Sequence, residues 1–406
     1  MHDQASLRFA VLQPGARLHY ALPAVLQRAG MLQRLYTDFA NVGPLRHLEK
    51  FLPRSLQPAP VRRMLGRKVP ADIPRSKVRE VRADIVRDRV VRLFSNGALN
   101  NAASMLAVAR KERFGGANAI YTVLVNEDIE ACREAKEGSR TIVHEAMLGP
   151  DVGLWLEEEH KRFPGRLHGT FSVDRVHAGR ERDRMKYQLA DLIIAPSDFV
   201  KRAVVELGAD VSRVDVVPYG IDASWLEADP RPVQGRALFV GSVGLRKGSH
   251  YLAEAARLLT QRSVSCDVRV VGPVDHRILR DPLFFGPDYV GQIPRTKVRE
   301  EFTTADVFVL PTLCEGSALV HLEAMACGVP VVTTPNCGSV VRDGVDGIIV
   351  PIRSATAIAD AIERIVTDRN LREAMSRNAR ERAAEFTLER YGDRLVAALC
   401  KLRPTN

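Results

Sequence analysis

Two glutamates in one short stretch have the residue type and spacing to do chemistry on a ligand. Glu315 and Glu323 lie eight positions apart in LCEGSALVHLEAMACGVPVV, residues 313–332. A carboxylate pair first suggests a glycosidase, with one acid and one nucleophile. A separation of about 9 Å along a helix axis instead favours two carboxylates that bind two parts of one hydroxyl-bearing ligand, since ionised carboxylates accept strong hydrogen bonds. The alternative for Glu323 is a helix-surface residue with a salt-bridge partner.

The elements around this pair predict a strand, a loop, a helix and a second strand. Val307–Leu310 is an apolar run that Pro311 ends. Ser317 is expected to cap the helix, and Gly328 to follow it in the left-handed conformation. Because open α/β sheets bind ligands at the carboxyl ends of their strands, the loop that holds Glu315 is expected to meet the substrate.

Two loops, the one that holds Glu315 and a second one earlier in the chain, are expected to bind a phosphate group. The free amides of a helix start and the helix dipole attract anions, and Gly316 would let a ligand approach the backbone. The residues expected to supply those amides are Ser317, Ala318, Leu319 and Val320. Arg246 and Lys247 follow the strand ALFVGS in a glycine-containing loop, and two cations there would neutralise a diphosphate. The alternative is a pair of solvated loop cations.

No metal or cofactor is expected. The chain has no Asp-X-Asp, no G-x-x-x-x-G-K-[ST] phosphate loop and no His/Cys pattern with metal-ligand spacing. His144 ends the buried strand RTIVHEA on the presumed cleft side, where it could donate to a sugar hydroxyl. A core histidine with satisfied hydrogen bonds is the alternative reading.

The positioning elements alternate between strand and helix along the chain, which predicts an α/β fold with two doubly wound, Rossmann-like domains and a cleft between them. The first domain is expected over residues 1–222, a polar linker over 223–235 and the second domain over 236–385, with residues 386–406 as a terminal helix.

Size and composition are those of a globular protein. The chain has 406 residues, of which 46% are hydrophobic and 27% charged. We expect a cytoplasmic protein with reduced cysteines, because no run of 18 apolar residues, signal-like start or paired CxxC spacing occurs.

Positive charge is concentrated between residues 46 and 92, where 14 Lys/Arg face 5 Asp/Glu. Such a block could dock on an anionic membrane surface, or could simply be a solvated face. No aromatic residues are interleaved as a base-stacking surface requires, so nucleic acid is not expected as a partner.

EGSALVHLEAMACGVPVV resembles the E-x7-E signature region of retaining family 4 glycosyltransferases (glycosyl transferases group 1), which have the GT-B architecture. DLIIAPSDFVKRAV, VVPYGID and FVGSVGLRKGSHYLAEA resemble other parts of that family. The resemblance implies transfer of a sugar from a nucleotide-sugar donor to a carbohydrate or lipid-linked acceptor. It also implies retained anomeric configuration, no metal, and a role in bacterial cell-envelope, exopolysaccharide or glycolipid synthesis.

The resemblance also implies residue roles. Glu315 would contact the donor sugar and Glu323 the ribose, while Lys247 and the amides of residues 317–320 would hold the diphosphate. His144 would sit beside the transferred sugar, and Gly15 in the loop nearest the acceptor. The residues implied to line the base are Val271, Gly272, Gln292 and Ile293. The last helix, residues 388–402, would cross back onto the first domain.

Two positions differ from the family pattern. Ser242 stands where an arginine is usual five residues before the lysine, and Arg246 is the expected substitute. Gly15 is a single glycine where a pair is frequent.

Two other functional classes stay open: a sugar-nucleotide epimerase or phosphorylase of similar architecture, and a non-catalytic nucleotide-sugar-binding module.

Overall fold

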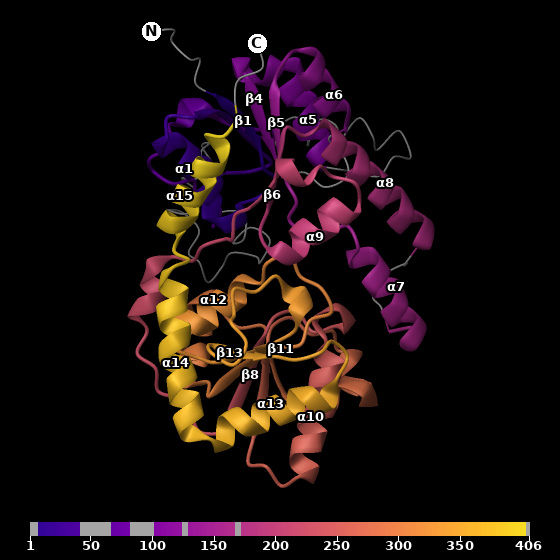
Figure 1. The fold of residues 1–406 in the computed structure, drawn as a ribbon, viewed down its shortest axis with the longest axis vertical. Helices are drawn as coiled ribbons and strands as arrows, with labels where there is room; N and C mark the ends of the chain where they lie inside the picture. The colour runs from indigo at the N-terminus through magenta and orange to yellow at the C-terminus, as the bar shows by residue number, and fades with distance from the viewer. Residues whose placement is uncertain (1–6, 41–65, 82–100, 124–128, 167–171, 403–406) are drawn as a thin grey trace, which may run out of the picture.

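The computed structural model describes residues 7–40, 66–81, 101–123, 129–166 and 172–402. Within these ranges the chain forms two parallel sheets flanked by helices, one in each lobe of the molecule (Figure 1). The expected α/β fold with two Rossmann-like domains is confirmed.

The first sheet has the order β3-β2-β1-β4-β5-β6-β7. Its strands are β1 (Phe9–Leu12), β2 (Leu32–Thr37), β3 (Val78–Glu80), β4 (Ala119–Thr122), β5 (Thr141–Glu145), β6 (Leu192–Ala195) and β7 (Val214–Val216). The helices among them are α1 (Ala21–Arg28), α5 (Asn101–Lys111), α6 (Ile129–Glu137), α7 (Val152–Arg162), α8 (Val173–Leu189) and α9 (Asp198–Glu206).

Strand β1 shows why this sheet is covered on both faces. Phe9 and Val11 pack into one hydrophobic cluster, whereas Ala10 and Leu12 pack into another. Successive side chains of a strand point to opposite faces, so a continuous apolar run is what a sheet buried on both sides requires. Pro23, which is awkward in a helix interior, lies in the first turn of α1, where its missing N–H costs nothing.

The second sheet has the order β10-β9-β8-β11-β12-β13. Its strands are β8 (Arg236–Val240), β9 (Asp267–Val271), β10 (Asp288–Gly291), β11 (Val307–Leu310), β12 (Val331–Thr333) and β13 (Gly347–Ile349). Its helices are α10 (Ser249–Gln261), α11 (Arg295–Thr304), α12 (Leu319–Ala326), α13 (Ala355–Thr367) and α14 (Arg369–Ala384). Strand order reverses between β8 and β11, so the loops after these two strands open at a switch point.

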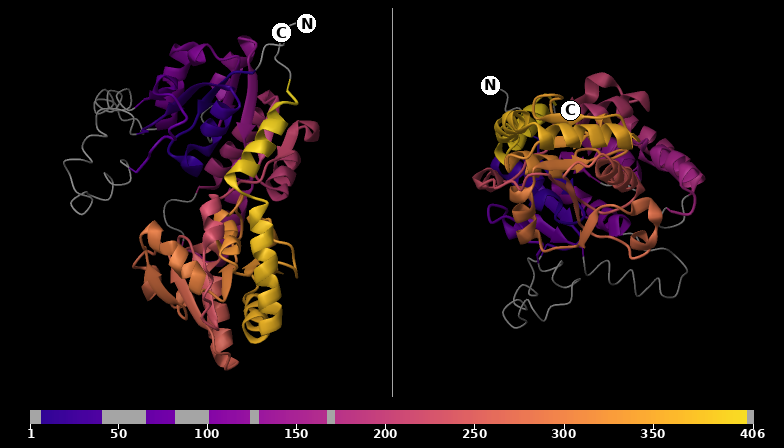
Figure 2. Two further views of the ribbon diagram at one scale, coloured as in Figure 1. Left: turned by 90° about the vertical axis from the view of Figure 1, so that its left-hand side faces the viewer. Right: turned by 90° about the horizontal axis from the view of Figure 1, so that it is seen from below.

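The last helix, α15 (Leu388–Leu399), returns to the first domain, as expected. Helix α14 runs along the second domain, and α15 continues beside α1 (Figures 1 and 2). Tyr391, Leu395 and Leu399 of α15 belong to the hydrophobic cluster of the first sheet. The chain therefore crosses between the domains twice, near residues 221 and 387. The two crossings lie side by side, since Ile221 N–H donates to the Phe386 carbonyl at 2.9 Å.

Residues 223–235, expected as a polar linker, contain an ordered apolar anchor. Ala223–Glu227 is a 3₁₀ turn in which Trp225 is buried edge-on against Phe302, with ring centroids 5.9 Å apart. The sequence pattern missed this because one large aromatic side chain, without any apolar period, supplies the packing.

Most of the basic block at residues 46–92 lies outside the described residues, and only 66–81 of it is placed. Among the helices that are described, none is long and apolar enough to cross a membrane. All six cysteines are free thiols.

Candidate functional site

The loops that follow β8 and β11 meet at the switch point of the second sheet. Lys247 Nζ lies 2.5 Å from Glu315 Oε1, and Arg246 forms an ion pair with the same carboxylate. The backbone fixes this arrangement, because Leu313 N–H donates to the Arg246 carbonyl at 2.8 Å. Sequence reasoning expected the two cations to face a helix end. The structure places them on the carboxylate just before it.

Gly248 explains why the cation loop can lie so close to the β11 loop. Its φ is +69°, in the left-handed region, and an added Cβ would collide with the Pro311 carbonyl oxygen. A residue with a side chain would therefore have an unfavourable backbone conformation here and would also clash with the Pro311 carbonyl. Gly248 thus sets the distance between Lys247 and Glu315.

Helix α12 begins one residue later than expected, at Leu319. Its N-cap is Ala318, with extended φ/ψ and no side-chain cap bond, so the predicted capping role of Ser317 is wrong. The reason is that Gly316 is held from the other domain: Ser197 Oγ donates to its carbonyl at 2.6 Å, which keeps the chain extended through Ala318. The amides of Leu319 and Val320, in the first helical turn, have no intrahelical acceptor and are available to an anion.

Gly316 also serves a purpose that the sequence did not predict. An added Cβ would collide with the Met147 carbonyl oxygen, which belongs to the first domain. The glycine here permits the close approach of another backbone. Gly316 is therefore a contact point between the domains.

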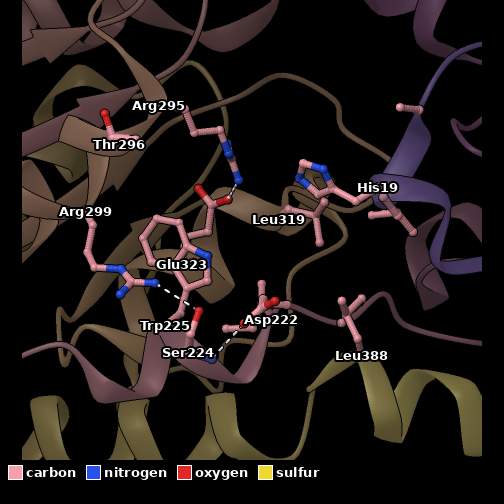
Figure 3. Close-up of a pocket in the computed structure, with 14 residues that line it drawn as sticks. His19, Asp222, Ser224, Trp225, Arg295, Thr296, Arg299, Leu319, Glu323 and Leu388 are labelled. Atoms are coloured by element: carbon pink, nitrogen blue, oxygen red, sulfur yellow. Dashed lines mark hydrogen bonds and ion pairs between the residues drawn. The ribbon is translucent and has the colours of Figure 1, made fainter. Parts of the chain in front are cut away.

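A pocket of about 880 Å³ lies between the domains beside α12 (Figure 3). Leu319 and Glu323 from the sequence prediction line it, and residues of the first loop and the crossing region complete it. The lining residues are Ala16, Leu18, His19, Gly220, Ile221, Asp222, Ser224, Trp225, Arg295, Thr296, Arg299, Leu319, Glu323 and Leu388. The expected cleft is thus confirmed.

Arginines of α11 organise one wall of this pocket. Arg295 Nη2 lies 2.5 Å from Glu323 Oε1 (Figure 3). Glu323, the second of the two carboxylates expected to bind the ligand, therefore has an ion-pair partner within the protein. The guanidinium carbons of Arg299 and Arg295 lie 5.0 and 6.0 Å from the centroid of Trp225. Arg299 also donates to Ser224 Oγ at 3.1 Å. Trp225 therefore orients both cations beside Glu323.

The first loop enters the pocket through a strained turn. Leu18, His19 and Tyr20 have φ of 47°, 52° and 61°, a left-handed run that costs roughly 1–2 kcal/mol per residue. The buried Tyr20 hydroxyl donates to the Phe39 carbonyl at 2.9 Å and holds this turn. As a result the His19 ring points toward Leu319 (Figure 3).

Gly15 precedes this turn and does not line the large pocket. Its φ is +70°, and its N–H donates to Asp38 Oδ1 at 2.8 Å. Arg17, two residues on, lies 3.1 Å from the buried Glu145 at the end of β5. Gly15 therefore lets the first loop turn, and Arg17 ties that loop to the middle of the sheet.

His144 occupies a separate, smaller pocket of about 220 Å³, between the end of β5 and the helices α7 and α8. Its ring lies 5.8 Å from that of Tyr187. Burial, together with the nearby Lys186 ammonium, holds the pKa of His144 well below its usual range. A neutral imidazole can donate one hydrogen bond, so the expected donor role fits, but the structure does not bring His144 into the larger pocket.

The four residues implied to line the base lie at the ends of neighbouring strands. Val271 ends β9, and Gly272 N–H donates to the Gly291 carbonyl at 2.9 Å, beside Gln292. Ile293 packs partly buried against the core of the second domain. None of the four is among the residues that line the large pocket.

Sequence reasoning missed His19, Asp222, Trp225, Arg295 and Arg299. One signal was present for two of them: Arg295 and Arg299 lie one turn apart at the start of a helix that directly follows GQIP. His19 comes from a turn of the first domain, Asp222 from the end of the expected first domain and Trp225 from the expected linker. Their approach to Glu323 depends on the tertiary structure.

Comparisons with known proteins agree with the fold. Residues 231–382 match the family model "Glycosyl transferases group 1". The chain is 35% identical over 237 residues to a D-inositol 3-phosphate glycosyltransferase of Geodermatophilus obscurus, covering 52% of each protein. It is 32% identical over 181 residues to the alpha-D-kanosaminyltransferase of Streptomyces kanamyceticus, covering 41% of this chain and 45% of that protein. The chain spans about half the length of the curated relatives it matches.

Among solved structures, that of Anabaena Alr3699/HepE in complex with UDP and glucose superimposes with a TM-score of 0.63. The match covers 98% of this chain and 100% of that one at 15% sequence identity. It supports the two-domain GT-B fold.

Proposed function

On the premise that residues 231–382 form a glycosyl transferases group 1 domain, we propose that the protein transfers a sugar from a nucleoside diphosphate sugar to an acceptor hydroxyl. We propose further that the anomeric configuration is retained and that no metal is required. The observation that carries this proposal is the convergence of Lys247 and Arg246 on Glu315, four residues before α12 begins.

This convergence suits a diphosphate that has no bound metal. Two cations and the free amides of Leu319 and Val320 would supply positive charge to a leaving group that develops negative charge. In the absence of donor, Glu315 neutralises Lys247 and Arg246. On binding, the diphosphate takes over the cations, which frees Glu315 to accept hydrogen bonds from the sugar hydroxyls.

The nucleoside has a corresponding place beside α12. Glu323 would accept hydrogen bonds from the ribose hydroxyls. The hydrogen bond between Arg295 and Glu323 would have to break as the donor enters. The base would then lie toward the ends of β9 and β10, at Val271, Gly272, Gln292 and Ile293. A relative in fold was crystallised with UDP and glucose, so UDP is the first nucleotide to test.

The proposed step balances without a catalytic carboxylate. The bond between the anomeric carbon and the β-phosphate oxygen breaks, and a bond from that carbon to the acceptor oxygen forms on the same face. The acceptor proton passes to the departing phosphate oxygen. Neutral His144 would donate a hydrogen bond to the transferred sugar, and orientation of the two substrates would supply much of the rate.

The acceptor and its location belong to the same proposal. We propose a carbohydrate or lipid-linked acceptor that reaches the first domain near Gly15. We place the enzyme in the cytoplasm, docked through residues 46–92 on the anionic inner membrane face and serving envelope polysaccharide or glycolipid synthesis. Sedimentation with anionic vesicles should show binding at low salt that high salt removes. A lack of binding at low salt would refute the docking.

The central experiment offers UDP-, GDP- and ADP-sugars, each with and without EDTA, and measures release of the nucleoside diphosphate. We expect release from one class, unchanged by EDTA, and a product whose anomeric configuration by NMR matches that of the donor. Interconversion of donors without release would indicate an epimerase, and a requirement for free phosphate would indicate a phosphorylase. Thermal stabilisation by a donor without turnover, tested over a panel of acceptors, would indicate a binding module.

A further inference from the structure

Helix α7 belongs to the first domain by sequence but lies against the second. It stands between β5 and β6 in the chain, yet it packs on the 3₁₀ turn Leu245–Lys247 that carries the two cations. Such a crossing allows a residue of one domain to control a loop of the other.

A buried carboxylate anchors this contact. Glu159 of α7 is fully buried and bonds to three residues of the second domain. Its Oε1 accepts from Tyr251 OH at 2.7 Å and lies 2.8 Å from His250 Nε2, while Oε2 accepts from Arg353 Nε at 2.8 Å. Burial alone would raise the pKa of Glu159, but these hydrogen bonds outweigh it and the pKa is lowered. The carboxylate is thus held ionised in the interface.

Residues around Glu159 make further contacts between α7 and the second domain. Phe163 lies edge-on against His250, with ring centroids 4.7 Å apart, and Arg353 lies 5.6 Å over the ring of Trp155. Arg353 has a left-handed φ of 63°, a conformation that non-glycine residues keep only where surrounding contacts hold it. Its bonds to α7 are such contacts.

The anchored turn is continuous with the cation loop. His250 and Tyr251 lie in the first turn of α10, separated from Lys247 only by Gly248 and Ser249. Fixing that turn therefore fixes where the loop ends. At its other end the same segment of the first domain presents the Met147 carbonyl to Gly316, next to Glu315. Residues 146–162 thus touch both loops that would hold the diphosphate.

We propose that residues 146–162 form a clamp between the domains, and that Glu159 is a positioning residue for the diphosphate-binding loop of Lys247. The inference rests on the proposed function. Glu159 touches no substrate in it. It sets the position of Lys247 relative to Glu315, and so the affinity for the diphosphate part of the donor, while the nucleoside part depends on Glu323 and is untouched.

The test compares Glu159→Gln with Glu158→Gln. Glu158 is the matched control because it lies on the same helix and bonds the same Arg353 at 2.9 Å, but its side chain is 55% exposed. UDP, GDP and ADP are titrated calorimetrically into the full chain, and the tightest is taken forward with its matching nucleoside, titrated by NMR. We expect Glu159→Gln to weaken diphosphate binding at least tenfold with an unchanged nucleoside Kd, and Glu158→Gln to change neither more than twofold.

Each outcome decides a separate point. If Glu159→Gln binds the diphosphate like the wild type, or loses nucleoside and diphosphate equally, the positioning role is wrong. If the wild type binds none of the three diphosphates, the proposed function falls and this inference with it. Should Glu159→Gln not fold, Tyr251→Phe removes one hydrogen bond to Glu159 and keeps the ring. It should then show the same split at a smaller size, and an unchanged diphosphate Kd in that variant would equally overturn the role.

Discussion

Lys247 Nζ lies 2.5 Å from Glu315 Oε1, although 68 residues separate the two in the chain. The pair joins the loops after β8 and β11. Within it, the positive charge of Lys247, which would attract an anionic donor, and the negative charge of Glu315, which would repel it, neutralise each other. In the proposed function a nucleoside diphosphate sugar would have to break this ion pair to bind, because Glu315 competes with the diphosphate for Lys247.

Removing either partner should abolish transfer while leaving the fold intact. We expect Lys247→Ala to lower the transfer rate about 100- to 1000-fold, the usual effect of removing one donor to a developing oxyanion, and Glu315→Ala to be inactive. Initial rates and thermal unfolding are the measurements. Lys297→Ala, an exposed lysine paired with Glu300 on α11, is the control, and full activity in either site variant would sink the assignment.

Glu323→Gln should weaken nucleotide binding about tenfold or more, because hydrogen bonds to a charged group contribute about 1.5–3 kcal/mol. Intrinsic fluorescence can report this, since the chain has two tryptophans and Trp225 lines the pocket. Nucleotide should change the emission of wild type and of Trp155→Phe, but not of Trp225→Phe. A signal that survives Trp225→Phe and disappears in Trp155→Phe would place the nucleotide elsewhere.

The terminal helix should contribute strongly to the stability of the first domain. Leu395 of α15 is fully buried in that domain's core, so Leu395→Ala should cost about 2–5 kcal/mol in the free energy of unfolding. Urea unfolding gives the value. The exposed Asp393 on the same helix provides the control, since Asp393→Ala should stay within about 0.5 kcal/mol of the wild type. Equal stability of the two variants would contradict the crossing.

Acid should destabilise the protein through buried histidines. Burial, with a smaller contribution from Lys247, lowers the pKa of His321 to about 3. Between that value and the ordinary pKa of about 6.5, the unfolded chain binds the extra proton. Stability therefore falls as pH drops below about 6.5, by up to about 1.4 kcal/mol per pH unit for this group. His321→Gln should flatten the decline measured by urea unfolding between pH 7 and 5, whereas His276→Gln, at an exposed position, should leave the slope unchanged.

Apart from the returning helix, which the family resemblance implied, the sequence by itself determined the two α/β domains and the positions of Glu315, Lys247 and Glu323 on their elements. These follow from local information: apolar runs and helical periods depend on residues near in the chain, and the carboxyl ends of parallel strands must share an edge.

Only the tertiary structure decided what these residues contact. The partner of Glu323 is Arg295, the glycine at 316 accommodates the Met147 backbone, and Glu159 reaches across the cleft to Tyr251. The contacts of Gly316 and Glu159 join segments whose separation is fixed by the docking of one whole domain on the other, whereas Arg295 and Glu323 lie on helices α11 and α12 of the same domain, which pack side by side. No periodicity or propensity encodes that docking, because it arises from the summed shape and charge of two finished surfaces.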